Sequence, residues 1–178
     1  MKLLRLPADE AAARRFSEEL WLPYHRDLEA TVADHALVGD DEEEIVDAEV
    51  EFRLGRLEEE SYRLWVAVDG VEASDDAVDL TAGDGELVGF VATSVDEAPS
   101  VFDRPDRLVV GDIYVRESSR GSGLARDLMA RAKRRAAETD CSELVLDVDV
   151  DNERALAFYE KMGFETLRRR MRVAVDEL

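Results

Sequence analysis

A strand-like run leads through two closely spaced glycines into a helix-like run in the second half of the chain. Residues 108–115 read L-V-V-G-D-I-Y-V, the turn 116–123 reads R-E-S-S-R-G-S-G, and residues 124–138 have helical character. Such a turn gathers unpaired backbone N–H groups at the positive end of a helix dipole. Because Gly121 and Gly123 lack a Cβ, an anion can approach their backbone closely. The segment therefore predicts a pyrophosphate-binding turn.

Three glycine-loop patterns can be distinguished at this turn. A P-loop requires a lysine directly after its second glycine, and no lysine follows either glycine here. The dinucleotide pattern G-x-G-x-x-G requires a third glycine where Arg126 stands. The pattern R-x-x-G-x-[GA] is satisfied by Arg120, Gly123 and Ala125.

A second pattern follows further along the chain. Residues 152–164 read N-x-x-A-x-x-F-Y-x-x-x-G-F, and they come after a strand-like alternation over 144–150. The two patterns, in this order, make the chain resemble the GNAT superfamily of N-acetyltransferases, whose acetyl-coenzyme A loop has the R-x-x-G-x-[GA] pattern. The resemblance covers about residues 86–173. It implies acetyl-coenzyme A as the co-substrate.

The resemblance also implies the architecture. We expect one α/β (α+β) domain over residues 1–178, with a mixed, mainly antiparallel central sheet flanked by helices and an acetyl-coenzyme A-binding core at about 86–173. The expected strands are 2–6, 62–69, 86–95, 108–115, 144–150 and 164–175. The expected helices are 8–35 with an interruption near Pro23, 40–60, 124–138, and one that Asn152 caps and Gly163 ends. In the family the central strand parts from the next one to admit pantetheine, here 108–115 from 144–150.

The cofactor-binding residues implied by the resemblance lie in and around the turn. The Val115 backbone is expected to contact the acetyl or pantetheine part, and the N–H groups of residues 121–126 the pyrophosphate. Asn152 is expected to touch the cofactor or hold the parted strands. The full set is Val115, Arg120, Gly121, Ser122, Gly123, Leu124, Ala125, Arg126 and Asn152. The opposite helix face, with Leu124, Leu128, Ala132 and Ala136, should pack on the sheet.

Positive charge is concentrated in this segment of an acidic chain. Residues 116–135 contain seven basic side chains and two acidic ones, whereas the whole chain has a formal charge of -20. Arg126 and Lys133 share one helix face and, with Arg120, are candidates to meet the phosphates. For residues 133–135 the alternative is that basic side chains simply favour a helix C-terminus.

The implied reaction is direct attack of a primary amine on the thioester in a ternary complex. An alkyl amine with a pKa of about 10.4 needs about 4.6 kcal/mol to become neutral at pH 7. Asp112 is the candidate base or water relay, and strand alternation places it on one face with Leu108, Val110 and Tyr114. Asp147 and Asp149 are the alternatives.

Tyr159 matches the family tyrosine that protonates the leaving thiolate. A phenol can donate a proton to a developing thiolate, so the step is chemically reasonable. Core packing is the alternative role, because Leu156 and Met162 lie three residues to either side. A catalytically silent acyl-coenzyme A-binding module is the competing function, since such a module keeps the loop and dispenses with Tyr159.

Composition excludes several other function classes. The acidic charge predicts a solvated surface adapted to high salt and argues against nucleic acid as a partner. Residues 1–7 are too short and charged for a signal peptide, and no apolar run reaches membrane length. With Cys141 as the single cysteine, these features indicate a cytoplasmic protein. Two histidines predict no metal site, and the Asp-rich run 147–151 lacks the glycine and glutamate of a calcium loop.

The acceptor is left open by the sequence. Residues 8–60, where the family selects its acceptor, carry no assignable pattern, so an amine-bearing small molecule, peptide or protein all fit. The family also suggests a homodimer. Arg168, Arg170 and Arg172 alternate along the expected last strand, where they either pair with surface acids or contact an anionic group of a substrate or another subunit.

Overall fold

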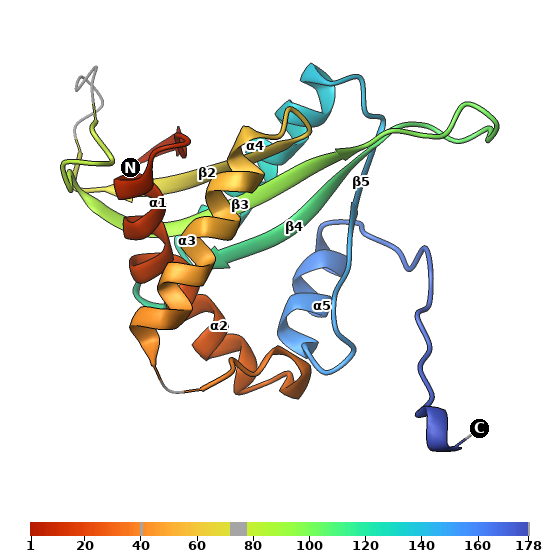
Figure 1. Ribbon diagram of the computed structural model, residues 1–178. Helices are drawn as coiled ribbons and strands as arrows, with labels where there is room; N and C mark the ends of the chain where they lie inside the picture. The colour runs from red at the N-terminus through yellow and green to blue at the C-terminus, as the bar shows by residue number, and fades with distance from the viewer. Residues whose placement is uncertain (40, 72–77, 178) are drawn as a thin grey trace. The chain divides into compact units, whose positions relative to one another are not determined.

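The computed structural model describes residues 1–39, 41–71 and 78–177 (Figure 1). Its contacts divide the chain into two compact units, Met1–Asp147 and Val148–Leu178. The first unit holds a five-stranded sheet whose order follows the chain, and its strands are β1 (Lys2–Arg5), β2 (Tyr62–Asp69), β3 (Glu86–Asp96), β4 (Arg107–Val115) and β5 (Glu143–Leu146). The first three pairings are antiparallel and the β4–β5 pairing is parallel. The expected mixed, mainly antiparallel sheet is confirmed.

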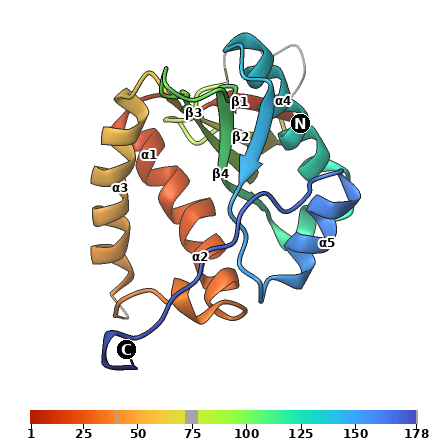
Figure 2. The ribbon, with the colours of Figure 1, turned by 90° about the vertical axis from the view of Figure 1, so that its right-hand side faces the viewer.

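Helices cover both faces of this sheet. They are α1 (Glu10–Phe16), a π-helical turn (Ser17–Trp21), α2 (Leu22–Glu29), α3 (Glu42–Glu58) and α4 (Leu124–Glu138), with short 3-10 turns at Ala33–His35 and Glu117–Ser119. Figure 2 shows α1 and α3 on one side of the sheet and α4 on the other. The helix expected over 40–60 begins at Glu42, after its Asp41 cap. Asp40 lies outside the described residues.

The hydrophobic core lies against both sheet faces. On the α1 side, Phe16 and Phe90 are fully buried and meet edge to face, with ring centroids 4.9 Å apart. On the α4 side, the residues expected to pack on the sheet are all buried, namely Leu124, Leu128, Ala132 and Ala136. The helical spacing of these residues therefore predicted the packed face correctly.

The interruption expected near Pro23 is a π-helical turn just before it, and the helix does not end there. The helix is continuous from α1 to α2 through the π-helical turn, in which the Leu22 amide donates to the Ser17 carbonyl. Because Pro23 has no N–H, it cannot supply the usual i+4 donor for the Glu19 carbonyl. The Arg116 guanidinium supplies it from the glycine turn, at 2.6 Å. This contact ties the helix to the end of β4.

Arg116→Gln is expected to lower the free energy of unfolding by about 1–3 kcal/mol, because it removes a charge-assisted hydrogen bond to a carbonyl that lacks its i+4 helical donor. Urea unfolding measures the loss. Arg104→Gln is the matched control, since it removes an equal charge from a pair with Asp96 that is partly exposed and should cost less than about 1 kcal/mol. Equal losses in the two variants would contradict the role of Arg116.

A buried ion pair within α3 also contacts the first residue of β2. Arg53 is only 3% exposed and binds Glu49 through its Nε at 2.7 Å, and it also donates to the Tyr62 hydroxyl. Burial raises the pKa of Tyr62 to about 12 and also raises the pKa of Glu49. Neutral Tyr62 thus accepts from Arg53 throughout the physiological pH range.

The second unit contains α5 (Glu153–Lys161). Asn152 caps this helix as expected, its side chain accepting from the Ala155 amide at 3.1 Å. Gly163 takes a left-handed φ of +91°, and the Phe164 amide then donates to the Tyr159 carbonyl at 3.0 Å. This closure is a usual helix C-terminus and confirms the expected role of Gly163.

Two expected strand assignments are wrong. The strand predicted for 144–150 ends at Leu146, and the strand predicted for 164–175 is absent, with only a 3-10 turn at Val175–Glu177. A strand needs a neighbour for its main-chain hydrogen bonds. None of the five described strands pairs with residues 164–175, and residues 165–174 are exposed. The four arginines within 168–172 also repel one another when they are held close together.

Among the residues that the structure describes, no helix combines the length and apolar character needed to cross a membrane.

Candidate active site

The glycine turn has the backbone geometry expected of an anion cradle. Gly121 and Gly123 have φ values of +80° and +97°, which side-chain-bearing residues rarely adopt. No atom lies within 4 Å of where a Cβ would stand on either residue, so the space above them is open. Gly123 is the N-cap of α4 and no side chain caps that end of the helix.

Several backbone donors converge at this helix end. At this turn, four amides have no hydrogen-bond acceptor among the described residues: those of Gly121, Ser122, Gly123 and Ala125. The Leu124 amide makes a long 3.4 Å contact with Ser122 Oγ, and the Arg126 amide donates to the Gly123 carbonyl at 2.9 Å. The amide of Arg126 is therefore part of the helix and is not offered to a ligand. The remaining donors fit a diphosphate.

The positive charge at the turn is smaller than the sequence indicates. Arg120 turns toward β4 and α2, donating to the Asp27 carboxylate at 2.7 Å and to the Val115 carbonyl at 3.2 Å. Arg131 pairs with Glu138. Arg126 and Lys133 are exposed and have no carboxylate partner within the described ranges, so they remain the cations best suited to meet phosphates.

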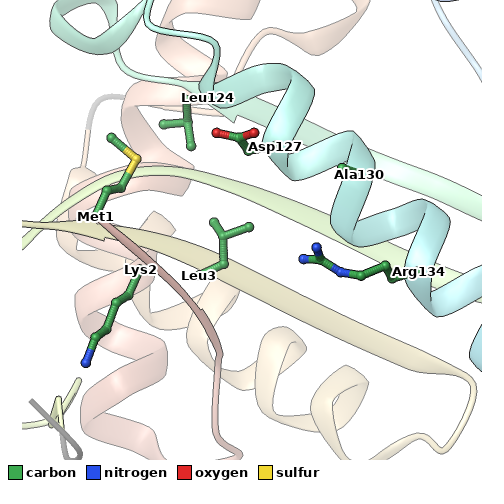
Figure 3. A pocket seen from close by; sticks show the side chains of 7 residues that line it. All are labelled: Met1, Lys2, Leu3, Leu124, Asp127, Ala130 and Arg134. Carbon is green, nitrogen blue, oxygen red and sulfur yellow. The ribbon is translucent and has the colours of Figure 1, made fainter. Parts of the chain in front are cut away.

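A shallow pocket of about 260 Å³ lies alongside α4 from Leu124 to Arg134, between that helix and β1 (Figure 3). Asp127 and Arg134 line it from α4, and Leu3 lines it from β1. Its lining carries charges of both signs, so it does not extend the anion cradle.

The central strand parts from β5 as the resemblance implies. Their parallel pairing runs from Arg107 to Val110 on β4 and stops at Leu146 on β5. At the same point the β3–β4 register slips, because Thr93 pairs with Val110 whereas Val91 pairs with Ile113. One extra residue on β4 makes this a β-bulge at residues 111–112. Residues 111–115 therefore continue without a β5 partner.

Because of the bulge, Asp112 lies on a different face of the sheet from the one that alternation predicts. Before it, Val110 pairs with Thr93, whose hydroxyl accepts from Arg135 of α4. After it, Tyr114 pairs with Phe90 in the core on the α1 side. The prediction that Asp112 shares a face with Leu108 and Val110 is wrong, because the extra residue shifts the alternation. Asp112 shares a face with Tyr114 and points toward α2.

Side chains of α2 surround Asp112. The Tyr24 hydroxyl donates to Asp112 Oδ1 at 3.3 Å, and the Tyr24 ring lies 5.5 Å from that of Tyr114. The Tyr114 hydroxyl donates to Asp27 Oδ2 at 3.2 Å. Burial raises the pKa of Tyr114, and the charge of Asp27 adds to the effect. Two carboxylates and two phenols are thus brought to one face of β4.

His25 extends this group. Its ring lies 4.3 Å from Trp21 and 6.3 Å from His35. Burial lowers the pKa of His25 below 6.5, with the nearby Asp112 charge opposing the effect. Sequence reasoning missed Tyr24, His25 and Asp27. The available signal was the run W-L-P-Y-H at 21–25, where aromatic rings cluster around a proline.

The lowered pKa of His25 predicts a loss of stability in acid. The unfolded chain binds a proton near pH 6.5 while the folded chain resists it, so this contribution is complete above that pH and is lost as pH falls below it. Each unit of pKa depression is worth about 1.4 kcal/mol. His25→Phe should therefore gain stability relative to the wild type between pH 7.5 and 5, measured by urea unfolding. A difference that stays constant across this range would contradict the assignment.

The remaining predicted residues fall in different places. Asp147 and Asp149 follow the end of β5 and belong to no strand. Tyr159 and Asn152 belong to the second unit. The Tyr159 ring is half-buried, with centroids 5.4 Å from Phe158 and 5.6 Å from Phe164. The part of the chain that the structure covers contains no cluster of three His, Cys, Asp or Glu side chains able to hold a metal ion.

Part of the chain is similar in sequence to known acetyltransferases. Mycothiol acetyltransferase of Saccharomonospora viridis is 32% identical over 122 residues, covering 66% of this chain and 37% of that protein. N-alpha-acetyltransferase 30 of Saccharomyces cerevisiae is 30% identical over 102 residues, covering 57% of this chain and 56% of that protein. The chain thus spans little more than half, or less, of these relatives.

Solved structures show the same fold at low identity. The tetramutant of the BH1408 protein from Bacillus halodurans aligns with a TM-score of 0.74 at 16% identity, over 98% of this chain and all of that one. The aminoglycoside N-acetyltransferase AAC(6')-Iy in complex with CoA aligns with a TM-score of 0.66 at 17% identity, over 97% of this chain and 93% of that one. The sequence model of the acetyltransferase (GNAT) family matches residues 9–164, a range that includes helices α1 to α4, the glycine turn and Tyr159. With its motifs, parted strands and fold in agreement, this chain belongs to the acetyltransferase (GNAT) family.

Proposed function

We propose that the protein is an N-acetyltransferase that transfers the acetyl group of acetyl-coenzyme A to a primary amine in a ternary complex. The observation that carries the proposal is the set of four unsatisfied amides at the N-terminus of α4, next to the end of β4 that has no β5 partner. Acetyl-coenzyme A supplies the acetyl group as a thioester. The chain's own residues bind it, orient it and move two protons.

The amides of residues 121–123 and Ala125 bind the diphosphate, because they point from a helix N-terminus with no competing acceptor. Arg126 and Lys133 contribute positive charge from α4. The β5-facing edge of β4, from residue 111 to Val115, has no strand partner and offers donors and acceptors to the amide groups of pantetheine. Arg120 positions the Val115 carbonyl and holds Asp27 of α2 near this strand end. Asn152 caps α5 and contributes a contact to the cofactor.

Asp112 accepts the proton of the attacking amine. Its carboxylate is fixed by the Tyr24 hydroxyl, and Asp27 adds a second negative charge on the same side. These charges attract an ammonium substrate before it is deprotonated. The acceptor is therefore a cationic amine, carried by a small molecule or a peptide. Two relatives point to these classes by name, a streptothricin acetyltransferase and an N-alpha-acetyltransferase.

Tyr159 donates a proton to the leaving thiolate. A thiol has a pKa of about 8.5 and a phenol one of about 10. Proton transfer from the phenol to the thiolate is therefore uphill by only about 1.5 pKa units, which a general acid can supply. The support is the match of Tyr159 to the family tyrosine and its place on α5, a helix closed by Asn152 and Gly163.

Calorimetry with acetyl-coenzyme A in molar salt, followed by a panel of amines assayed for free thiol release, tests the function. We expect saturable binding and turnover with at least one amine. Binding without turnover on any amine would favour a silent acyl-coenzyme A-binding module, and no binding would exclude both.

Gly123→Val should weaken acetyl-coenzyme A binding at least tenfold, because valine resists a φ of +97° and the turn must rearrange. Gly55→Ala is the matched control, since Gly55 lies in α3 with open space around it and no left-handed φ. Both dissociation constants come from the same calorimetry. Unchanged binding in Gly123→Val would remove the turn from the cofactor site.

A further inference from the structure

We propose a second anion-binding site, for a doubly charged phosphoryl group, at the C-terminal end of α4. It is built by four arginines, Arg5 of β1, Arg63 of β2, and Arg131 and Arg135 of α4, around a pocket of about 430 Å³. A pocket of this size lies within the range of small-molecule sites. The site stands independently of the proposed acetyltransferase activity.

The sheet register brings the strand arginines together. Arg5 pairs with Trp65 across β1 and β2, and Arg63 lies two residues before Trp65. All three side chains therefore share the face that α4 covers. From α4, the Arg131 guanidinium lies 4.3 Å and the Arg135 guanidinium 5.6 Å from the Trp65 ring centroid. Trp65 and all four arginines line the same pocket.

Arg135 is a buried cation with neutral partners. It is 3% exposed and donates to the Thr93 carbonyl at 3.2 Å, the Thr93 hydroxyl at 2.9 Å and the Ser61 carbonyl at 2.5 Å. Burial and the nearby positive charges of Arg63 and Arg131 lower its pKa to about 10. Helix capping, the simplest explanation for a basic residue near a helix C-terminus, does not account for this burial. The positive charges crowd one another here.

The pocket has too few carboxylates to balance its arginines. Arg131 is held by Glu138 through two contacts of 3.1 Å. Arg63 donates to the backbone carbonyls of Glu59 and Tyr62, and no carboxylate binds Arg63 or Arg5 in the described part of the chain. Glu60 and Glu138 are the acidic side chains of the lining. Four positive and two negative charges leave a net charge of +2, in a protein whose net charge is -20.

This net charge and its donors define the ligand class. Packing on Trp65 explains Arg131 and Arg135, but it does not explain why Arg5 and Arg63 are directed to the same pocket. Their guanidinium groups offer the planar donor pairs that match phosphoryl oxygens. The site is separate from the glycine turn, because the twelve helical steps from Gly123 to Arg135 span about 18 Å.

Trp65 provides a direct reporter for the test. The chain has two tryptophans, so Trp21→Phe leaves Trp65 as the only one. With acetyl-coenzyme A saturating, so that the glycine turn is occupied, inorganic phosphate is titrated against sodium chloride of equal ionic strength. We expect a saturable change in Trp65 fluorescence with phosphate alone. A parallel titration with succinate separates phosphoryl from carboxylate recognition.

In the same background, Arg5→Gln and Arg63→Gln should each raise the half-saturating phosphate concentration at least tenfold, whereas Arg104→Gln, an equal charge change on the β3–β4 loop, should not. Circular dichroism checks the fold of each variant. Because Arg5 is exposed, Arg5→Gln should fold, and it tests the site even if Arg63→Gln unfolds. No saturable change, or an unaltered midpoint in Arg5→Gln, would overturn the site. Tighter binding of succinate than of phosphate would overturn its phosphoryl assignment.

Discussion

Asp112→Asn is expected to lower kcat/KM for amine acetylation by about 10²- to 10⁴-fold while leaving acetyl-coenzyme A binding unchanged. Asparagine keeps the size of the side chain and still accepts the hydrogen bond from Tyr24, but it cannot take a proton from the amine. The rate then depends on the small fraction of amine that is already neutral in solution. Steady-state kinetics and calorimetry on the same preparation separate the two effects.

The pH profile distinguishes a proton acceptor from a structural carboxylate. As pH rises toward the pKa of the amine, solvent supplies the neutral nucleophile, so the deficit of Asp112→Asn should shrink. Asp27→Asn is the matched control, because Asp27 also accepts from a tyrosine hydroxyl, that of Tyr114, in the same neighbourhood. It should lose less than about tenfold. A deficit that is equal in both variants, or independent of pH, would contradict the role of Asp112.

Local patterns predicted those parts of the fold that depend on local physics. The strand at Tyr62–Asp69 and the helix at Leu124–Glu138 begin and end where the sequence predicts. Alternation and helical spacing are properties of a single segment, and Asn152 and Gly163 act on their own helix ends. The glycine turn was equally local, since its φ values follow from the two glycines themselves.

Features set by pairing between distant segments could not be predicted. The β-bulge at residues 111–112 arises where β4 meets β3 at Val91 and Thr93, and no signal within β4 alone reveals it. Asp112 was therefore found as a candidate but placed on the wrong face. Residues 164–175 alternate like a strand and yet have no partner among the described strands. Alternation of polar and apolar residues indicates that one face of a segment can be buried. It does not show that a neighbouring strand is available for pairing.

The residues of α2 that surround Asp112 were missed for a related reason. Tyr24 and Asp27 lie almost 90 positions from Asp112 and Tyr114 in the chain, and hydrogen bonds between the two pairs bring them together. Neither residue belongs to a motif. The same holds for Arg5 and Arg63, whose place on the same sheet face as Trp65 follows from the β1–β2 register.

Tyr159→Phe should lower kcat by about 10²- to 10⁴-fold without changing the dissociation constant of acetyl-coenzyme A, because it removes one hydroxyl and keeps the ring that meets Phe158 and Phe164. Phe158→Leu is the control for packing, since it alters the same aromatic contact and leaves the phenol in place. A smaller loss in that variant assigns the effect to the hydroxyl.

If Tyr159→Phe turns over at the wild-type rate, the tyrosine is a packing residue and the thiolate leaves unprotonated or takes its proton from water. If kcat and cofactor affinity fall together in both variants, α5 supports the cofactor site through packing, and the proposed proton donor must be sought on another element.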